Sequence, residues 1–142
     1  MNLSSRVKRT RVANAAAGAT TDINSSSVDM QGFRAVEFVV AFGAITAGAV
    51  TSCKLQGSSD DSAWSDLTGA TVTIADDDDN KVAILDCAKP RHRYIRCVVD
   101  RGTQNAVLDG IVAQQYMAQD EPVTHDATTV AATVLKHAPA AA

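Results

Sequence analysis

The chain has 142 residues, which is short enough that we expect one domain with a single hydrophobic core. Hydrophobic residues make up 46% of the sequence but aromatic residues only 4%, so the core must be mainly aliphatic. The formal net charge of -3 excludes a protein whose whole surface binds nucleic acid, and the longest uncharged run, residues 38–53, is too short and too rich in glycine and threonine to cross a membrane. We therefore expect neither nucleic acid nor a membrane among its partners.

Residues 1–20 are predicted to form an extended basic arm. The first half is basic, and residues 13–19 are rich in alanine and glycine and offer little that can form a core. We predict one short strand within this arm, over residues 7–12, and we expect the arm to become ordered on a partner. Its candidate interaction residues are Arg6, Lys8, Arg9 and Arg11.

Residues 21–118 are predicted to form an all-β domain. Short runs of β-branched and apolar residues are separated at roughly even spacing by Gly, Asp, Asn, Ser or Pro, which is typical of antiparallel strands. Besides residues 7–12, we predict strands over residues 21–30, 35–42, 50–56, 71–74, 81–87, 94–100 and 105–117. Eight strands suit an antiparallel β-sandwich of jelly-roll type. Residues 43–49 contain two glycines and are predicted to be a loop rather than a helix.

The strand over residues 94–100 has a period of two, which predicts that Ile95, Cys97 and Val99 face the core. In contrast, the run over residues 36–42 is apolar at nearly every position, which is typical of a strand covered on both faces. Such a strand is either central in its sheet or part of an interface. We therefore add Val36, Phe38 and Val40 to the candidate interaction residues.

Residues 119–142 are predicted to form a second extended arm, rich in alanine, threonine and proline, that also needs a partner to become ordered. Just before it, Asp109-Gly110 fits either a two-residue hairpin turn or a bulge within one long strand, and both interpretations stay open.

The three cysteines, Cys53, Cys87 and Cys97, cannot all pair within the chain and show no zinc-site spacing. Free cysteine packs as a small hydrophobic residue, so we expect buried thiols and assembly in a reducing cytoplasm.

Two charged clusters stand out. The run Asp76 to Asp79 has adjacent carboxylates and no glycine at the bend of a calcium loop, so we expect a solvated hairpin loop, with a bound cation as the alternative. The basic cluster lacks the interleaved aromatic residues of a single-strand nucleic-acid platform, and we expect it to be solvated or to pair with an acidic rim of a neighbouring copy. Its residues are Lys89, Arg91, His92, Arg93, Arg96 and Arg101, of which Arg91, Arg93 and Arg96 are candidate interaction residues.

No catalytic motif is present, and the histidines His92, His125 and His137 are scattered. We expect no enzyme activity, no catalytic residues, no cofactor and no metal site. Trp64, the only tryptophan, is interpreted as a packing residue over the core, with a sugar-stacking platform as the alternative. It is the last candidate interaction residue.

Four short motifs carry a resemblance to a known group of proteins. They are a Ser/Asp-rich loop ending in Trp-Ser-Asp-Leu over residues 58–67, an acidic turn over residues 76–81, Arg-Tyr-Ile-Arg over residues 93–96, and Val-Asp-Arg-Gly-Thr over residues 99–103. Through these motifs, the segment from about residue 22 to residue 126 resembles small structural proteins of tailed bacteriophages and prophages.

This resemblance implies a virion structural protein that binds the outer surface of the capsid as a decoration or cement protein, or that forms the base of a head fibre. It implies the major capsid protein and further copies of this chain, in a homotrimer or homodimer, as partners. The location would be the capsid exterior, after assembly in the cytoplasm of the host bacterium. A tail or neck structural protein is one alternative, and a carbohydrate-binding module for host adsorption is another.

Overall fold

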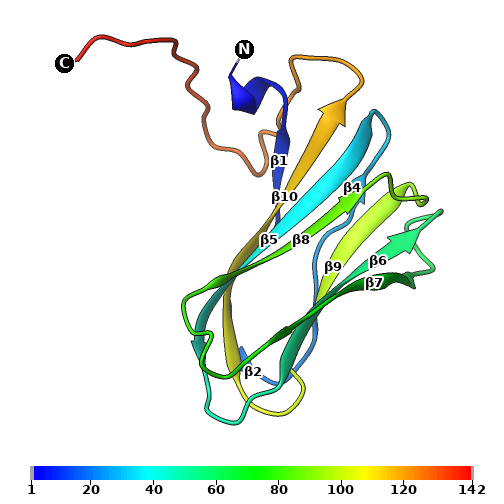
Figure 1. Ribbon diagram of the computed structural model, residues 1–142, viewed down its shortest axis with the longest axis vertical. Coiled ribbons are helices and arrows are strands. Elements are labelled where there is room, and N and C mark those ends of the chain that lie inside the picture. The colour runs from blue at the N-terminus through cyan, green and yellow to red at the C-terminus, as the bar shows by residue number, and fades with distance from the viewer. Residues whose placement is uncertain (1, 142) are drawn as a thin grey trace.

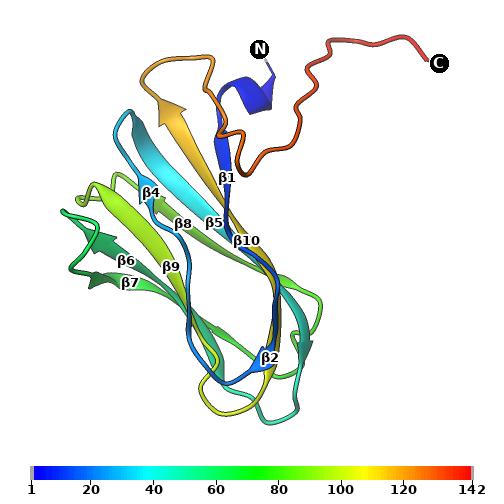
Figure 2. The same cartoon turned by 180° about the vertical axis from the view of Figure 1, so that it is seen from behind.

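The computed structural model describes residues 2–141, which form a sandwich of two antiparallel β-sheets (Figure 1, and from behind in Figure 2). Sheet A contains β1 (Lys8–Ala13), β10 (Ala106–Ala118), β5 (Phe33–Ile45) and β8 (Val82–Ala88) in that order, and β2 (Ala16–Ala19) also pairs with β10. Sheet B contains β3 (Ile23–Asn24), β9 (Tyr94–Asp100), β6 (Thr51–Ser58) and β7 (Ser65–Ile74), and β4 (Val28–Asp29) also pairs with β9. The predicted all-β sandwich is confirmed.

The pairing of the strands is that of a jelly roll. Strand β1 pairs with β10, β3 and β4 pair with β9, β5 pairs with β8, and β6 pairs with β7. The first half of the chain therefore runs antiparallel to the second half as one long ribbon, which is rolled up so that successive pairs lie in opposite sheets. This topology places the first and last strands side by side, and both chain ends leave the sandwich at the same end (Figure 1).

The core between the sheets is aliphatic with two phenylalanines, Phe38 and Phe42, as the composition predicts. Ile95, Cys97 and Val99 of β9 are fully buried, which confirms the predicted faces of that strand. Cys53 is buried on β6 and lies in the same core. Cys87 differs from the prediction, because it lies near the end of the edge strand β8 and is only half-buried.

The sandwich begins at Lys8, which corrects the predicted boundary between an N-terminal arm and a domain starting at residue 21. Within the predicted strand, Val12 points into the core while Arg9 and Arg11 lie on the other face, and this alternation is sufficient for an edge strand of sheet A. The following segment is held by Arg101, a buried side chain that the sequence groups with the basic cluster. Its guanidinium donates hydrogen bonds to the carbonyl oxygens of Ala17, Thr21 and Ala106 at 2.8 to 2.9 Å.

Three other elements refine the prediction. Residues 21–30 form two short strands rather than one, because the chain between them bridges the sheets: the amide of Ser25 donates to Cys97 in sheet B and that of Ser26 donates to Val12 in sheet A. Strand β7 begins at Ser65, earlier than predicted, since its polar first half pairs with β6. The register shift between Leu108 and Gly110 shows that Asp109-Gly110 is a bulge within β10.

After β10, residues 119–141 contain no strand or helix and run away from the sandwich past the N-terminus, on the side of sheet A (Figures 1 and 2). We call this segment the C-terminal arm. The helical element of the described residues is the single 3-10 turn η1 (Leu3–Ser5), so no helix within residues 2–141 is long enough to cross a membrane.

Candidate interaction surface

The predicted interaction residues Val36, Phe38 and Val40 are not on the surface. All three are 0% exposed, because β5 is a central strand of sheet A and directs these side chains into the core between the sheets. The other apolar residues of this run, Val39 and Ala41, lie on the outer face of sheet A, where neighbouring strands partly cover them. The burial of Val36, Phe38 and Val40 corrects the prediction that these three residues belong to an interaction surface.

The outer face of sheet A carries an apolar row that crosses the sheet. Val39 of β5 pairs with Ile84 of β8 on one side and with Val112 of β10 on the other. Next to this row, Val82 pairs with Ala41. Ile84 and Val82 are 59% and 57% exposed, so the row is open to solvent at the β8 edge. A contiguous apolar patch of this kind is typical of an interaction surface.

A second row on the same face is charged. Arg9 of β1 pairs with Gln114 of β10, Gln114 pairs with Glu37 of β5, and Glu37 pairs with Asp86 of β8. The basic and acidic ends of the row therefore lie at opposite edges of the sheet. The Tyr116 hydroxyl donates a hydrogen bond to Asp86, and this bond, with burial and the nearby carboxylates, raises the pKa of Tyr116 to about 12.

The C-terminal arm forms a groove over the β1 edge of this face. The groove has a volume of about 510 Å³ and is lined by Arg9, Arg11 and Val112 from the sheet and by Val130 and Val134 from the arm. The base of the arm is attached to the N-terminal segment through His125. Of the predicted basic residues, Arg9 and Arg11 thus lie at the groove and on the outer face of sheet A.

His125 fixes the base of the arm to residues 4–9. Its Nδ1 accepts a hydrogen bond from the backbone N–H of Arg9 at 3.2 Å, and its Nε2 lies 3.0 Å from the carbonyl oxygen of Ser4. A carbonyl oxygen only accepts, so Nε2 carries the proton and the ring is neutral. The amide of Val123 donates to the carbonyl of Ser5, and the guanidinium of Arg6 lies 3.9 Å from the carboxylate of Glu121.

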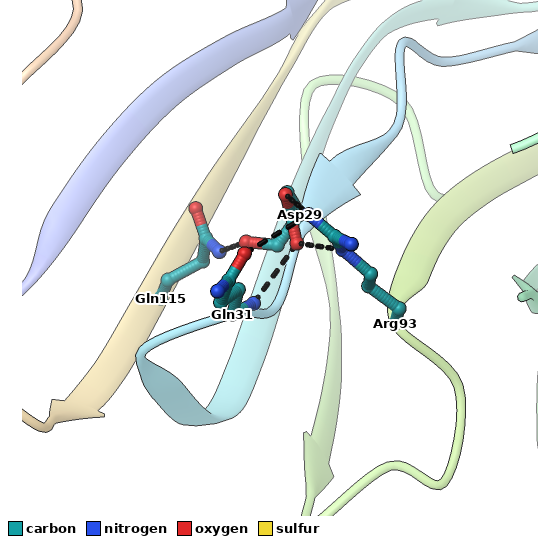
Figure 3. Close-up of polar contacts among 4 residues, drawn as sticks. All are labelled: Asp29, Gln31, Arg93 and Gln115. Atoms are coloured by element: carbon teal, nitrogen blue, oxygen red, sulfur yellow. Dashed lines mark hydrogen bonds and ion pairs between the residues drawn. The ribbon is translucent and has the colours of Figure 1, made fainter. Parts of the chain in front are cut away.

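At the same end of the sandwich, Arg93 pairs with Asp29 inside the chain (Figure 3). The Arg93 Nη2 donates to Asp29 at 2.9 Å and to Gln31 Oε1 at 2.9 Å, and Gln115 of sheet A donates to the carbonyl of Asp29 at 2.7 Å. The guanidinium beside it lowers the pKa of Asp29. Arg93 therefore holds its own chain together at this end, and Lys8, the remaining predicted residue of the N-terminal segment, is half-buried nearby on β1.

The other predicted residues lie on the sheet B side. The Arg96 guanidinium carbon is 4.4 Å from the centre of the Trp64 ring, and its Nε donates to Gln56 Oε1 at 2.9 Å. One face of the Trp64 ring is therefore occupied by Arg96. Arg91 is exposed in the connection between β8 and β9. The structure thus separates Arg91, Arg93 and Arg96 from Arg9 and Arg11 rather than joining them in one basic patch.

The acidic turn over residues 76–79 connects sheet B to sheet A and is not a solvated hairpin loop. Asp76 accepts a hydrogen bond from the amide of Gly48 at 2.6 Å, and Asp79 accepts one from the amide of Ile45 at 2.9 Å, so these carboxylates fasten the turn to the end of β5 and to the connection between β5 and β6. Asp78 pairs with Lys81 at 2.9 Å. Within the described residues, 2–141, no group of three or more His, Cys, Asp or Glu side chains is placed to hold a metal ion.

The surface residues Val39, Val82, Ile84 and Val112 were missed by the sequence prediction. The alternation of Val82 and Ile84 with the buried Ala83 and Leu85 gives a run that is apolar on both faces, and such a run does not show which face is exposed. The strand register supplies that information, because it places Ile84, Val39 and Val112 side by side on one face.

No protein-family model and no curated protein sequence match this chain. Among solved structures, XepA, a PBSX exported protein, is similar over 96% of this chain with 17% sequence identity and a TM-score of 0.55. The similar region is 45% of XepA, so this chain spans less than half the length of that protein. A protein of Bacillus endospore appendages, described as a family of disulfide-linked pili, is similar over 78% of this chain and 88% of its own, with 8% identity and a TM-score of 0.49. The likeness to XepA shows that the two proteins share the fold.

Proposed function

We propose that this chain is a non-enzymatic virion structural protein that binds the outer surface of a phage capsid and stabilises or decorates it. The observation that carries the proposal is the exposure of the C-terminal arm. Val134 and Leu135 are 79% and 52% exposed, and every described residue from 131 onward is exposed. Burial of these apolar side chains is favourable, and a partner surface would supply it.

The motifs that resemble phage structural proteins have structural roles, in keeping with this proposal. In the loop over residues 58–67, Asp60 accepts hydrogen bonds from the amides of Ser62 and Ala63 at 3.0 and 2.9 Å and so shapes the turn. In the turn over residues 99–103, Arg101 clamps the segment after β2. The fold that this chain shares with XepA also supports the proposal that it is related to phage structural proteins.

The surroundings of His125, Cys53 and Cys97 support a protein without catalysis. His125 is engaged by backbone groups on both ring nitrogens, and burial raises the pKa of the Cys53 and Cys97 thiols, which opposes formation of a nucleophilic thiolate. Arg96 covers one face of the Trp64 ring, so the carbohydrate-binding alternative is left with at most the other face for sugar stacking. The proposed partners are the major capsid protein and further copies of this chain, on the capsid exterior.

The proposal is tested by binding to purified capsids that lack this protein. We expect the full chain to sediment with capsids at saturation in a fixed ratio to the major capsid protein, and to appear as outer density in electron microscopy. Deletion of residues 131–142, or the double substitution Val134→Asp and Leu135→Asp, should abolish binding. A matched control, Ala140→Asp with Ala141→Asp, adds the same charge to the same arm and should still bind. Binding to purified tails instead of capsids would overturn the proposal in favour of the tail alternative.

A further inference from the structure

We propose that two copies of this chain pack face to face through the outer face of sheet A, related by a twofold axis parallel to the strands. The proposal rests on the part of the proposed function that names further copies of this chain as partners, and it assigns the surface through which two copies meet. The apolar row of Ile84, Val39 and Val112 would form the centre of the contact. In the isolated chain, nothing in residues 2–141 covers the β8 end of this row, where Ile84 is exposed.

The charged row determines the relative orientation of the two copies. A twofold axis parallel to the strands reverses the strand order across the contact, so that β1 of one copy lies over β8 of the other and β10 lies over β5. Residues at the same position along the strands of the two copies then face each other. Arg9 of one copy lies opposite Asp86 of the other, and Gln114 lies opposite Glu37, because these residues share one row of the register.

The alternative twofold axis, perpendicular to the strands, is disfavoured by charge. It would place β1 over β1 and, when centred on the apolar row, would bring Arg11 of each copy against Arg11 of the other. The parallel axis instead brings a cation to a cluster that already holds Glu37, Asp86 and the Tyr116 hydroxyl. Opposite charges across an interface fix orientation and exclude wrong pairings.

The groove under the C-terminal arm accepts the exposed edge of the second copy. With β8 of the second copy over β1, the side chain of its Ile84 comes to Arg11 and Val112, which form the floor of the groove. Val130 of the arm would then cover the apolar edge from the other side. Each arm thus closes over the β8 edge of its partner, and the symmetry repeats this contact at the other end of the interface.

The test is the mass of the full chain in solution, measured by sedimentation equilibrium over a range of concentrations and without capsids. This measurement is independent of capsid binding, so the two proposals can fail separately. We expect a reversible dimer of twice the chain mass. Ile84→Arg should raise the dissociation constant by about tenfold or more, because it replaces an apolar contact by a cation that faces Arg11 of the other copy. The control Val50→Arg changes a similarly exposed valine in the connection between β5 and β6, outside the strands of sheet A, and should leave the dimer unchanged.

A charge exchange tests the orientation. Arg9→Asp and Asp86→Arg should each weaken the dimer, and the double variant should restore it. Because Arg9 and Asp86 lie at opposite edges of the sheet in one chain, such a restoration requires contact between copies. Circular dichroism would confirm that each variant is folded. A single chain mass at every concentration, a trimer, a dimer that survives Ile84→Arg, or a double variant as weak as the single ones would each overturn the proposal.

Discussion

Asp29 of β4 in sheet B pairs with Arg93 through its carboxylate and is joined to sheet A through its backbone carbonyl. Arg93, which directly precedes β9, donates to the Asp29 carboxylate from Nε at 3.1 Å and from Nη2 at 2.9 Å, while the Asp29 carbonyl accepts a hydrogen bond from Gln115 of sheet A. A two-pronged ion pair of this geometry is among the stronger exposed pairs. Its contribution to stability stays small, since the two side chains are 43% and 51% exposed.

The first prediction is that Asp29→Asn lowers the free energy of unfolding at neutral pH by about 1 kcal/mol or less. Arg93 lowers the pKa of Asp29 in the folded protein, so this stabilisation is present above the ordinary aspartate pKa of about 3.9 and is lost as the pH falls through the lower pKa of the folded state. The difference from the unmodified chain should therefore shrink in acid, as measured by urea unfolding at pH 7 and about pH 2.5. Asp77→Asn serves as an exposed control. A difference that stays constant down to that pH would contradict the prediction.

The second prediction is that Arg101→Met destabilises the fold by at least about 2 kcal/mol. The buried guanidinium satisfies three backbone carbonyls, and their loss would leave buried acceptors without donors. Arg101→Lys should recover only part of this loss, because an ammonium group cannot reproduce the planar set of donors. Arg91→Met, at an exposed position, should have little effect in the same denaturant titration. Equal midpoints for the Arg101 and Arg91 variants would show that the clamp is unimportant.

Much of the fold was predictable because the strands follow local patterns. The period of two in residues 94–100 places β9 and its buried face, and the turn residues separate most of the other strands. The N-terminal boundary was not predictable, since Val12 is the single buried hydrophobic residue of β1 and its core contact depends on pairing with β10, about a hundred residues later in the chain. The bulge at Asp109-Gly110 likewise depends on the register with β5.

The interaction surface was harder to predict than the fold. Arg9 and Arg11 were identified from their charge, but their relation to Glu37 and Asp86 exists only through the alignment of four strands across sheet A. For Arg93 and Arg96, charge alone suggested a surface for partners, whereas the structure engages both within the chain, with Asp29 and with Trp64. A run of apolar or charged residues shows which side chains a strand carries, whereas the strand register determines which side chains of the neighbouring strands lie beside them.

The third prediction concerns the thiols. Burial raises the pKa of Cys53 and raises that of Cys97 to about 12, so both should react slowly with a thiol reagent at pH 8 in the native state, and the half-buried Cys87 should react faster. All three should react quickly in denaturant. Cys97→Ser should lower the free energy of unfolding by roughly 1 to 3 kcal/mol, because it buries a hydroxyl in the core, and Cys87→Ser should cost less. A Cys97 thiol as reactive as that of a short peptide would contradict its placement in the core.

The last prediction is that the imidazole of His125 holds the base of the C-terminal arm. Its two hydrogen bonds need an acceptor at Nδ1, for the N–H of Arg9, and a donor at Nε2, for the carbonyl oxygen of Ser4. His125→Leu can make neither bond, so we expect the amides of Arg9 and Val123 to lose protection from hydrogen exchange, while core amides such as that of Cys97 keep theirs. His137→Leu, at an exposed position, should leave the protection unchanged. Equal protection of the Arg9 amide in His125→Leu and in the unmodified chain would show that the arm is held by contacts other than the imidazole.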